Sequence, residues 1–266
     1  MTLFPSSAID QPFTLLHATV LGVVEGITEF LPISSTAHLI LASKALGLGD
    51  SEFVKSFEII IQLGAILSVV VLYWSKFWRW DVFTKLVVAF LPTGVIGLTV
   101  YRAIKTYLLG NVTVVLWALI VGGVLLIAFD RYTKPSTAQV DLSEITYKRA
   151  FLIGLFQSIA MIPGVSRAAA TIIGGSAIGV SKRTIVEFSF MLAVPTMLGA
   201  SALDLLKSHS ALAGHLTTLS VGFIVSFVTA IFAIKSFISY IKRKDFAAFG
   251  WYRILLAVVY FFVFVR

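Results

Sequence analysis

The sequence predicts an all-α integral membrane protein with six transmembrane helices and two re-entrant helical hairpins. Three observations lead to this fold class: 58% of the 266 residues are hydrophobic, only 13% are charged, and the apolar residues gather in long runs. Soluble domains carry about 25% charged residues, so this chain has too little polar surface to fold in water. We therefore expect the bilayer to be its solvent.

Six segments approach the roughly 20 apolar residues that a membrane-spanning helix needs. Two further apolar stretches, Phe13 to Val24 and Phe151 to Val165, run into Pro and polar residues before they could cross, and we interpret them as re-entrant halves. Irregular backbone at membrane depth is tolerated only where it is buried in protein or lines a wet cavity, so we expect the function at these breaks. The six predicted spans are Ile59 to Trp74, Leu86 to Tyr101, Val112 to Phe129, Glu187 to Leu206, Leu219 to Ile238 and Trp251 to Val265.

The two halves of the chain resemble each other at an offset of about 130 residues, with chance similarity among apolar segments as the alternative. Each half has one short hairpin and three spans, and because three is odd the second half must be inverted in the membrane. We divide the single integral domain, residues 1–266, into a first inverted repeat (1–130), a connecting cytoplasmic loop (131–150) and a second inverted repeat (151–266). The matching residues are Gly22 to Glu25 with Pro32 and Ser34, against Gly154 to Gln157 with Pro163 and Ser166.

The first break carries two carboxylates, Glu25 and Glu29, which share one face of a helix because they are four residues apart. Two such carboxylates inside a bilayer repel each other and lose solvation, so they need a cation, a metal or a shared proton. Oxygen ligands suit hard cations, so Mg²⁺ or Ca²⁺ is the predicted cofactor. The alternative is that both side chains merely reach the membrane interface.

Three hydroxyl residues follow Pro32: Ser34, Ser35 and Thr36. They are natural N-caps for a helix over Ala37 to Leu46, and the free N–H groups at such a helix start bind anions. His38 lies within reach of these hydroxyls and is a candidate for chemistry, with a packed core histidine as the alternative.

The second break contains Arg167, the only basic residue deep in either re-entrant element. Its burial is costly unless it is paired, and its planar fork suits phosphate oxygens. The alternative is a structural ion pair with Glu25 or Glu29. Pro163 and Gly164 break the helix and Ser166 can cap the next one.

The stretches Glu25 to His38 and Pro163 to Arg167 closely resemble the bacterial undecaprenyl-diphosphatase family, the bacitracin-resistance phosphatases. The resemblance covers nearly the whole chain. It implies a hydrolase of the bacterial cytoplasmic membrane that converts undecaprenyl diphosphate to undecaprenyl phosphate and inorganic phosphate. This reaction recycles the lipid carrier for peptidoglycan synthesis, and so supports cell wall biogenesis, cell shape and bacitracin resistance. The chain departs from the family at Ala168 and Ala169, where a Ser-Gly pair often follows the Arg, which leaves backbone N–H groups and Thr171 to take over any hydroxyl contact.

We therefore expect a phosphoanhydride hydrolase whose active site forms where the two loops meet. Glu25 and Glu29 hold the metal, Arg167 and the helix N-termini bind the diphosphate, and the isoprenoid tail lies in an apolar groove open to lipid. Either Ser35 or His38 is the nucleophile, or His38 is a base that activates a hydroxyl or water, while Glu29 also counts among the catalytic residues. The remaining predicted substrate-binding residues are Ser34, Thr36, Gly164, Ser166 and Thr171.

The rival function is transport, because inverted repeats with broken helices also build secondary carriers. Such a protein would flip polyprenyl phosphate or move a small anion. For the hydrolase, the expected partners are the polyprenyl diphosphate lipid substrate and membrane lipids. The chain has no cysteine, which excludes thiolate nucleophiles and disulfides. We interpret its net charge of +8 as a signal of membrane topology and not of nucleic-acid binding. The oligomeric state is left open between a monomer and a homodimer.

The cations also predict the orientation. If each re-entrant hairpin returns to its starting side, twelve cations lie on one face and six on the other, which makes the first face cytoplasmic and puts both termini outside. The cytoplasmic set is Lys76, Arg79, Lys85, Arg131, Lys134, Lys148, Arg149, Lys182, Arg183, Lys242, Arg243 and Lys244, and the outer set is Lys44, Lys55, Arg102, Lys105, Lys207 and Arg266.

Overall fold

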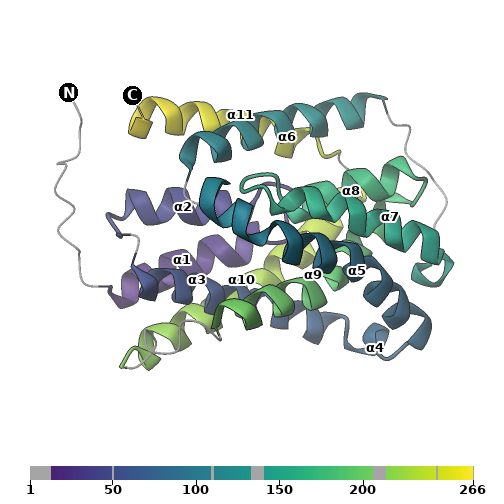
Figure 1. Cartoon of the computed structure of the whole chain (residues 1–266), viewed down its shortest axis with the longest axis horizontal. Coiled ribbons are helices and arrows are strands. Elements are labelled where there is room, and N and C mark those ends of the chain that lie inside the picture. Colours follow the sequence, from purple (N-terminus) through teal and green to yellow (C-terminus); the bar gives the residue numbers. More distant parts are fainter. Residues whose placement is uncertain are drawn as a thin grey trace.

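The computed structural model describes residues 13–49, 51–108, 111–132, 141–205, 214–243 and 245–265, and all regular elements in these ranges are helices (Figure 1). Six of them are long and apolar enough to cross a membrane, which confirms the predicted fold class. They are α3 (Glu52–Leu72), α5 (Trp80–Ala103), α6 (Val112–Tyr132), α9 (Lys182–Leu205), α10 (Leu216–Ile241) and α11 (Ala247–Tyr260), which continues as the π-helix η5 (Phe261–Val265).

Several spans begin earlier than hydropathy predicted, and at α3 and α9 a serine cap extends the helix beyond the apolar run. The helix α3 begins at Glu52 instead of Ile59, since the side chain of Ser51 accepts a hydrogen bond from the backbone N–H of Val54 at 3.2 Å. A capping hydroxyl satisfies an N–H group that has no partner within the helix. Hydropathy locates the apolar part of a helix and misses such an extension.

Two hairpins of short helices lie between the spans. The first joins α1 (Leu15–Thr28) to α2 (Ser35–Ala45), and the second joins α7 (Tyr147–Ser158), through the 3₁₀ turn η3 (Ile159–Met161), to α8 (Arg167–Ala177). At 1.5 Å per residue, even α1 with its 14 residues reaches only about 21 Å, less than the roughly 30 Å of a hydrocarbon core. Figure 1 shows the first hairpin in the left half of the molecule and the second in the right half, with the two turns near the centre.

The break in the first hairpin lies further along the chain than predicted. The apolar run ends at Val24, but α1 continues through Glu25 to Thr28, and the N–H of Glu29 still donates to the carbonyl of Glu25 at 2.9 Å. Glutamate is a good helix former, so a change in polarity does not end the helix. The hairpin thus carries its carboxylates on the last helical turn. That these hairpins re-enter the membrane stays a prediction.

Close helix packing holds each hairpin against a span. The helix α1 packs on α10 and α3, α7 packs on α5 and α8, and α11 packs on α6. A Cβ atom at Gly26 would lie 1.9 Å from Thr229 Oγ1, and one at Gly154 would lie 1.9 Å from the carbonyl oxygen of Ala89. Glycine at these two positions allows the backbones to approach, as small residues do between membrane helices.

Ion pairs and hydrogen bonds join the loops that carry most of the predicted cytoplasmic cations. Lys76 pairs with Glu187, Arg79 with Asp141 at 3.1 Å, and Lys182 with Asp245 at 3.0 Å. The N–H and hydroxyl of Ser143, together with Arg79, lower the pKa of Asp141 to about 2, so this partner of Arg79 stays charged at neutral pH. These cations therefore share one end of the molecule. Four residues of the two predicted sets lie outside the described residues: Lys134, Lys207, Lys244 and Arg266.

One buried cation in a span ties the two hairpin turns together. Arg253 of α11 is 0% exposed, and its guanidinium donates five hydrogen bonds, all to backbone carbonyls. One of them goes to the turn of the first hairpin, two go to the turn of the second, and two go to α6. The acceptors are the carbonyls of Pro32 (3.2 Å), Gly164 (2.8 Å), Val165 (3.0 Å), Ala118 (2.9 Å) and Leu119 (3.3 Å), of which Pro32 belongs to the first turn and Gly164 and Val165 to the second.

The side chain of Arg253 has five N–H donors, which equals the number of carbonyls that it contacts. Gly122 provides the room, since a Cβ atom there would lie 2.2 Å from Arg253 Nη2. The sequence analysis did not single out Arg253. An arginine inside an apolar span is itself a signal, because such residues are costly and need internal partners.

Replacing Arg253 is expected to destabilise the protein. Each buried carbonyl left without a donor costs about 1–3 kcal/mol, so Arg253→Met should lower the unfolding temperature in detergent by several degrees or more. Arg253→Lys keeps the charge and three donors and should lose less. The matched control is Arg243→Met at an exposed position. An unfolding temperature of Arg253→Met equal to that of the wild type would contradict this role.

The orientation can be tested with C-terminal fusions. If the cation-rich end faces the cytoplasm, a phosphatase that works only in the periplasm should be active when fused to the C-terminus, and green fluorescent protein at the same position should stay dark. The opposite pair of results would refute the predicted orientation.

Candidate active site

A cavity of about 250 Å³ lies where the two hairpin turns meet. Seven of the ten predicted site residues line it, and three do not: Glu25, His38 and Thr171. The lining also includes residues of α3, α5 and α9 that the sequence analysis did not select. The predicted residues on the wall are Glu29, Ser34, Ser35, Thr36, Gly164, Ser166 and Arg167.

The same backbone conformation, a serine with positive φ, shapes both turns. Ser34 and Ser166 are the two non-glycine residues with positive φ in the described chain, at 72° and 75°. Each accepts a hydrogen bond from the N–H three residues on, Ala37 at 3.4 Å and Ala169 at 3.2 Å, and so each is an N-cap, as predicted. A left-handed conformation is costly for a residue with a Cβ atom and is found mainly at functional sites.

Because of these caps, two helices begin at the cavity. Ser35 and Thr36 at the start of α2, and Arg167 at the start of α8, all line it. The first N–H groups of a helix have no partner within the helix and carry partial positive charge. Two helix N-termini that meet at one cavity favour an anion there.

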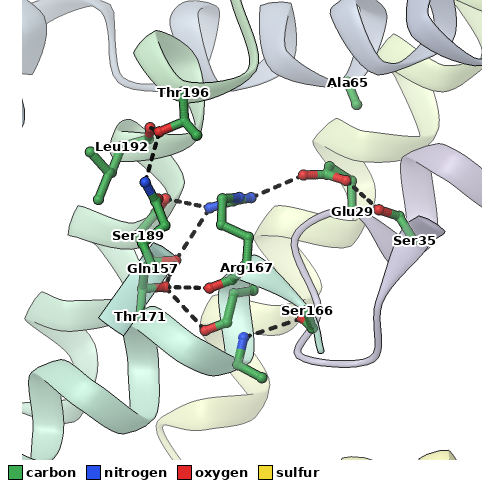
Figure 2. Close-up of polar contacts among 12 residues, drawn as sticks. Glu29, Ser35, Ala65, Gln157, Ser166, Arg167, Thr171, Ser189, Leu192 and Thr196 are labelled. Atoms are coloured by element: carbon green, nitrogen blue, oxygen red, sulfur yellow. Dashed lines mark hydrogen bonds and ion pairs between the residues drawn. The ribbon is translucent and has the colours of Figure 1, made fainter. Parts of the chain in front are cut away.

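Glu29 lies between a hydroxyl and a cation. Its Oε2 accepts a short hydrogen bond from Ser35 Oγ, and its Oε1 accepts one from Arg167 Nη2 at 3.1 Å. Figure 2 shows this arrangement, with Ser35 on one side of the carboxylate and Arg167 on the other. Glu29 and Arg167 are nearly buried, with side chains 5% and 11% exposed. The ion pair considered from the sequence is therefore present, and it involves Glu29.

Arg167 retains one donor for a ligand. Its Nη1 donates to the carbonyl of Ser189 at 2.7 Å, and its Nε is buried with no partner among the described residues. Thr171 lies behind it, where its hydroxyl contacts Ser189 Oγ at 2.6 Å and the carbonyl of Arg167 at 2.9 Å. Thr171 thus supports Arg167 and does not reach the cavity.

His38 points away from the cavity. Its Nδ1 lies 2.8 Å from the carbonyl oxygen of Ser34, and its Nε2 lies 2.8 Å from the hydroxyl of Tyr252. A carbonyl can only accept, so Nδ1 carries the proton, and in the neutral ring Nε2 accepts from Tyr252. Both nitrogens are therefore used in holding the first turn against α11.

Glu25 is fully buried, and neither of its carboxylate oxygens has a hydrogen-bond partner among the described residues. The negative charges of Glu29 and Glu58 and the positive charge of Arg167 act on it from nearby. Unpartnered buried carboxylate oxygens fit a cation or a proton. Across the described ranges, no three side chains of His, Cys, Asp or Glu gather as a ready-made metal site.

The sequence analysis missed several polar residues of the wall. Gln62 lies inside α3, Gln157 lies on the last turn of α7, and Thr93 and Thr196 lie in α5 and α9. Each of the two threonines directly follows a proline inside its span, Pro92 and Pro195. Polar residues inside apolar spans tend to face the protein interior, so these positions carried a usable signal.

A second, larger hollow is apolar. It measures about 760 Å³ and lies between the end of α1, the first turn, α10 and α11. It shares no lining residue with the smaller cavity. The smaller cavity has an apolar part of its own, formed by Ala160, Met161, Met197 and Ala200.

Comparison with known sequences agrees with the family resemblance of the two motifs. Residues 18–259 match the family described as bacitracin resistance protein BacA. The chain is 49% identical over 252 residues to the undecaprenyl-diphosphatase of Aquifex aeolicus, which covers 93% of this chain and 98% of the relative. It is 51% identical over 247 residues to the undecaprenyl-diphosphatase of Bdellovibrio bacteriovorus, covering 92% of this chain and 94% of the relative. The protein belongs to the bacitracin resistance protein BacA family.

Proposed function

We propose that this protein hydrolyses undecaprenyl diphosphate to undecaprenyl phosphate and inorganic phosphate in the bacterial cytoplasmic membrane. The family membership and the names of its relatives support this reaction. The observation that carries the proposal is the hydrogen bond from Ser35 Oγ to Glu29 Oε2, in a cavity that also holds Arg167 and two helix N-termini. A serine activated by a carboxylate beside an anion site is an arrangement for phosphoryl transfer.

In the first half of the reaction, Ser35 is the nucleophile. Its oxygen bonds to the terminal phosphorus, the bond from that phosphorus to the bridging oxygen breaks, and undecaprenyl phosphate leaves. Glu29 takes the proton of Ser35 as the bond forms. The hydrogen bond between the two side chains supports this choice over His38, because both ring nitrogens of His38 already have partners, the carbonyl of Ser34 and the hydroxyl of Tyr252. His38 is then a positioning residue for the first turn.

The charge on the diphosphate is neutralised by donors from both turns. Arg167 Nε and the N-termini of α2 and α8 are the donors in place, and fixed donors of this kind stabilise charge that develops in the transition state. Ser34, Ser166 and Gly164 shape the two turns and Thr36 contributes a hydroxyl on the wall. The isoprenoid tail leaves along the apolar part of the same cavity, past Met161 and Met197.

A divalent cation, Mg²⁺ or Ca²⁺, fits Glu25 and one oxygen of Glu29, because the oxygens of Glu25 are buried without partners and such ligands suit hard cations. Bound there, it would neutralise charge beside the diphosphate. The protein residues supply the nucleophile, the base and the donors.

The organisation of the chain is part of the proposal: residues 1–130 and 151–266 form inverted repeats around a cytoplasmic loop, 131–150, and both termini lie outside. The matching turns at Ser34 and Ser166 support it. A homodimer is the proposed alternative to a monomer. Transport of polyprenyl phosphate or of a small anion is the alternative function, against which the Ser35–Glu29 contact weighs, because a carrier needs no nucleophile.

Phosphate release from undecaprenyl diphosphate by the purified protein in detergent tests the function. Wild-type protein should release phosphate without a sealed membrane, and Ser35→Ala should lower kcat by roughly a thousand-fold or more, because the nucleophile is lost. His38→Gln should retain far more activity. Ser176→Ala, on the last turn of α8 outside the cavity, is the matched control. No release by the wild type, with lipid translocation in proteoliposomes, would support a carrier.

Metal dependence tests the role of the carboxylates. Glu25→Gln and Glu29→Gln should each lose most activity, because either change weakens cation binding, and high metal concentration should partly rescue at least one of them. Glu52→Gln, at an exposed position at the start of α3, should behave as the wild type. Full wild-type activity in excess chelator would eliminate the metal.

A further inference from the structure

Gln157 lies in the wall of the cavity and carries one acceptor that has no partner among the described residues. It is 2% exposed and its Nε2 donates two hydrogen bonds, to Thr93 Oγ1 at 2.9 Å and to Thr196 Oγ1 at 3.0 Å. Both protons of the amide nitrogen are thereby used. The amide oxygen, Oε1, is buried and has no partner among the described residues.

The two threonines fix which way the amide faces. Thr93 gives its hydroxyl proton to the carbonyl of Gly154 at 3.0 Å, and Thr196 gives its own to the carbonyl of Leu192 at 2.8 Å. A hydroxyl has one proton, so both oxygens can only accept from Gln157. The opposite orientation would set Oε1 against two acceptors. The NH₂ group therefore faces the threonines, of which Figure 2 shows Thr196 beside the amide nitrogen.

Packing reinforces this position. Gly154, one turn before Gln157, brings α7 against α5, where a side chain would collide with the backbone of Ala89. Gln157 and both of its threonine partners line the same cavity as Ser35, Glu29 and Arg167. The oxygen of Gln157 is thus held at the reaction site by three helices.

The chemistry of the cavity limits what Oε1 can bind. The oxygens of an ionised diphosphate are acceptors, and two acceptors that face each other without a proton repel. Leaving a buried amide oxygen unpaired costs about 1–3 kcal/mol. Its ligand must be a donor, and in hydrolysis the donor that has to enter the site is water.

We propose that Gln157 Oε1 holds and orients the water that hydrolyses the phosphorylated Ser35. This inference rests on the proposed function, since it requires a phosphoserine. The water oxygen bonds to phosphorus while the bond from phosphorus to Ser35 Oγ breaks. Ser35 recovers its proton from Glu29, which took it in the first half, and both protons of the water leave with the product as dihydrogen phosphate.

If Gln157 orients the water, a change at Gln157 should slow the second half-reaction and leave the first, the transfer of phosphate to Ser35, in place. Gln157→Met has a side chain of similar length without an amide oxygen. It should still transfer phosphate to Ser35, so that undecaprenyl phosphate appears in a burst close to one per protein. Steady turnover should then fall about a hundred-fold, as for a misplaced reactant. With substrate radiolabelled in the terminal phosphate, the label should stay on the protein and be lost in a Gln157→Met, Ser35→Ala double variant.

The double variant Thr93→Val, Thr196→Val tests the same role without altering Gln157. It replaces Gln157→Met as the test if that variant folds poorly. Without the two hydroxyl acceptors the amide is free to turn, so labelled protein should accumulate to a level between wild type and Gln157→Met. The matched control is Thr84→Val, at a threonine of α5 outside the cavity, which should accumulate no more label than the wild type.

The outcomes are distinguishable. A Gln157→Met variant that loses burst and steady turnover in parallel, or one that turns over normally, would overturn the inference while leaving the phosphatase function in place. A wild-type protein that releases no phosphate would overturn the proposed function and this inference with it.

Discussion

The structure depends on the guanidinium of Arg253 and the five carbonyls that it holds. Both hairpin turns expose backbone groups that no helix satisfies, and at membrane depth such groups need partners within the protein. Arg253 supplies donors to the first turn at Pro32 and to the second at Gly164 and Val165. An unpaired buried charge is costly, but here the same charge is stabilised by carbonyl dipoles. Together with the ion pair between Glu29 and Arg167, this side chain fixes the position of one turn relative to the other, and hence the cavity between them.

The two turns share a backbone form but contribute opposite chemistry. Each begins a helix at a serine with positive φ. The residue after Ser34 is Ser35, a nucleophile candidate bonded to Glu29, whereas the residue after Ser166 is Arg167, a cation. A site made from two identical turns would hold two nucleophiles or two cations. Because the two turns differ at this one position, the cavity has both a serine hydroxyl bonded to a carboxylate and a guanidinium cation.

The sequence predicts the elements well and their long-range contacts poorly. The six spans follow from hydropathy, and the caps at Ser34 and Ser166 follow from local chemistry, because both depend on residues near in the chain. The pairing of Arg167 with Glu29 was one of two options, since charge alone does not say which carboxylate is nearer. The ring of His38 is hydrogen-bonded to the hydroxyl of Tyr252, 214 residues away in the chain. Arg253 donates to the carbonyl of Pro32, 221 residues away. No local pattern encodes such contacts, because they arise only when α11 packs beside the first turn.

The buried polar groups of this molecule fall into two sets, those with hydrogen-bond partners and those without partners among the described residues. Glu25 Oε1 and Oε2, Gln157 Oε1 and Arg167 Nε all lack partners, and all belong to the two hairpins at or near the cavity. Two others lie away from it, Asp130 Oδ2 and Ser176 Oγ, and of these Asp130 is already held by backbone N–H groups of Phe246 and Ala247. The groups in the hairpins are two kinds of acceptor and one donor, while Arg253, Thr93 and Thr196 are fully engaged. Polar atoms that hold the two turns in place are satisfied within the protein, and those without partners among the described residues are the ones to which the proposed cation, phosphate and water are assigned.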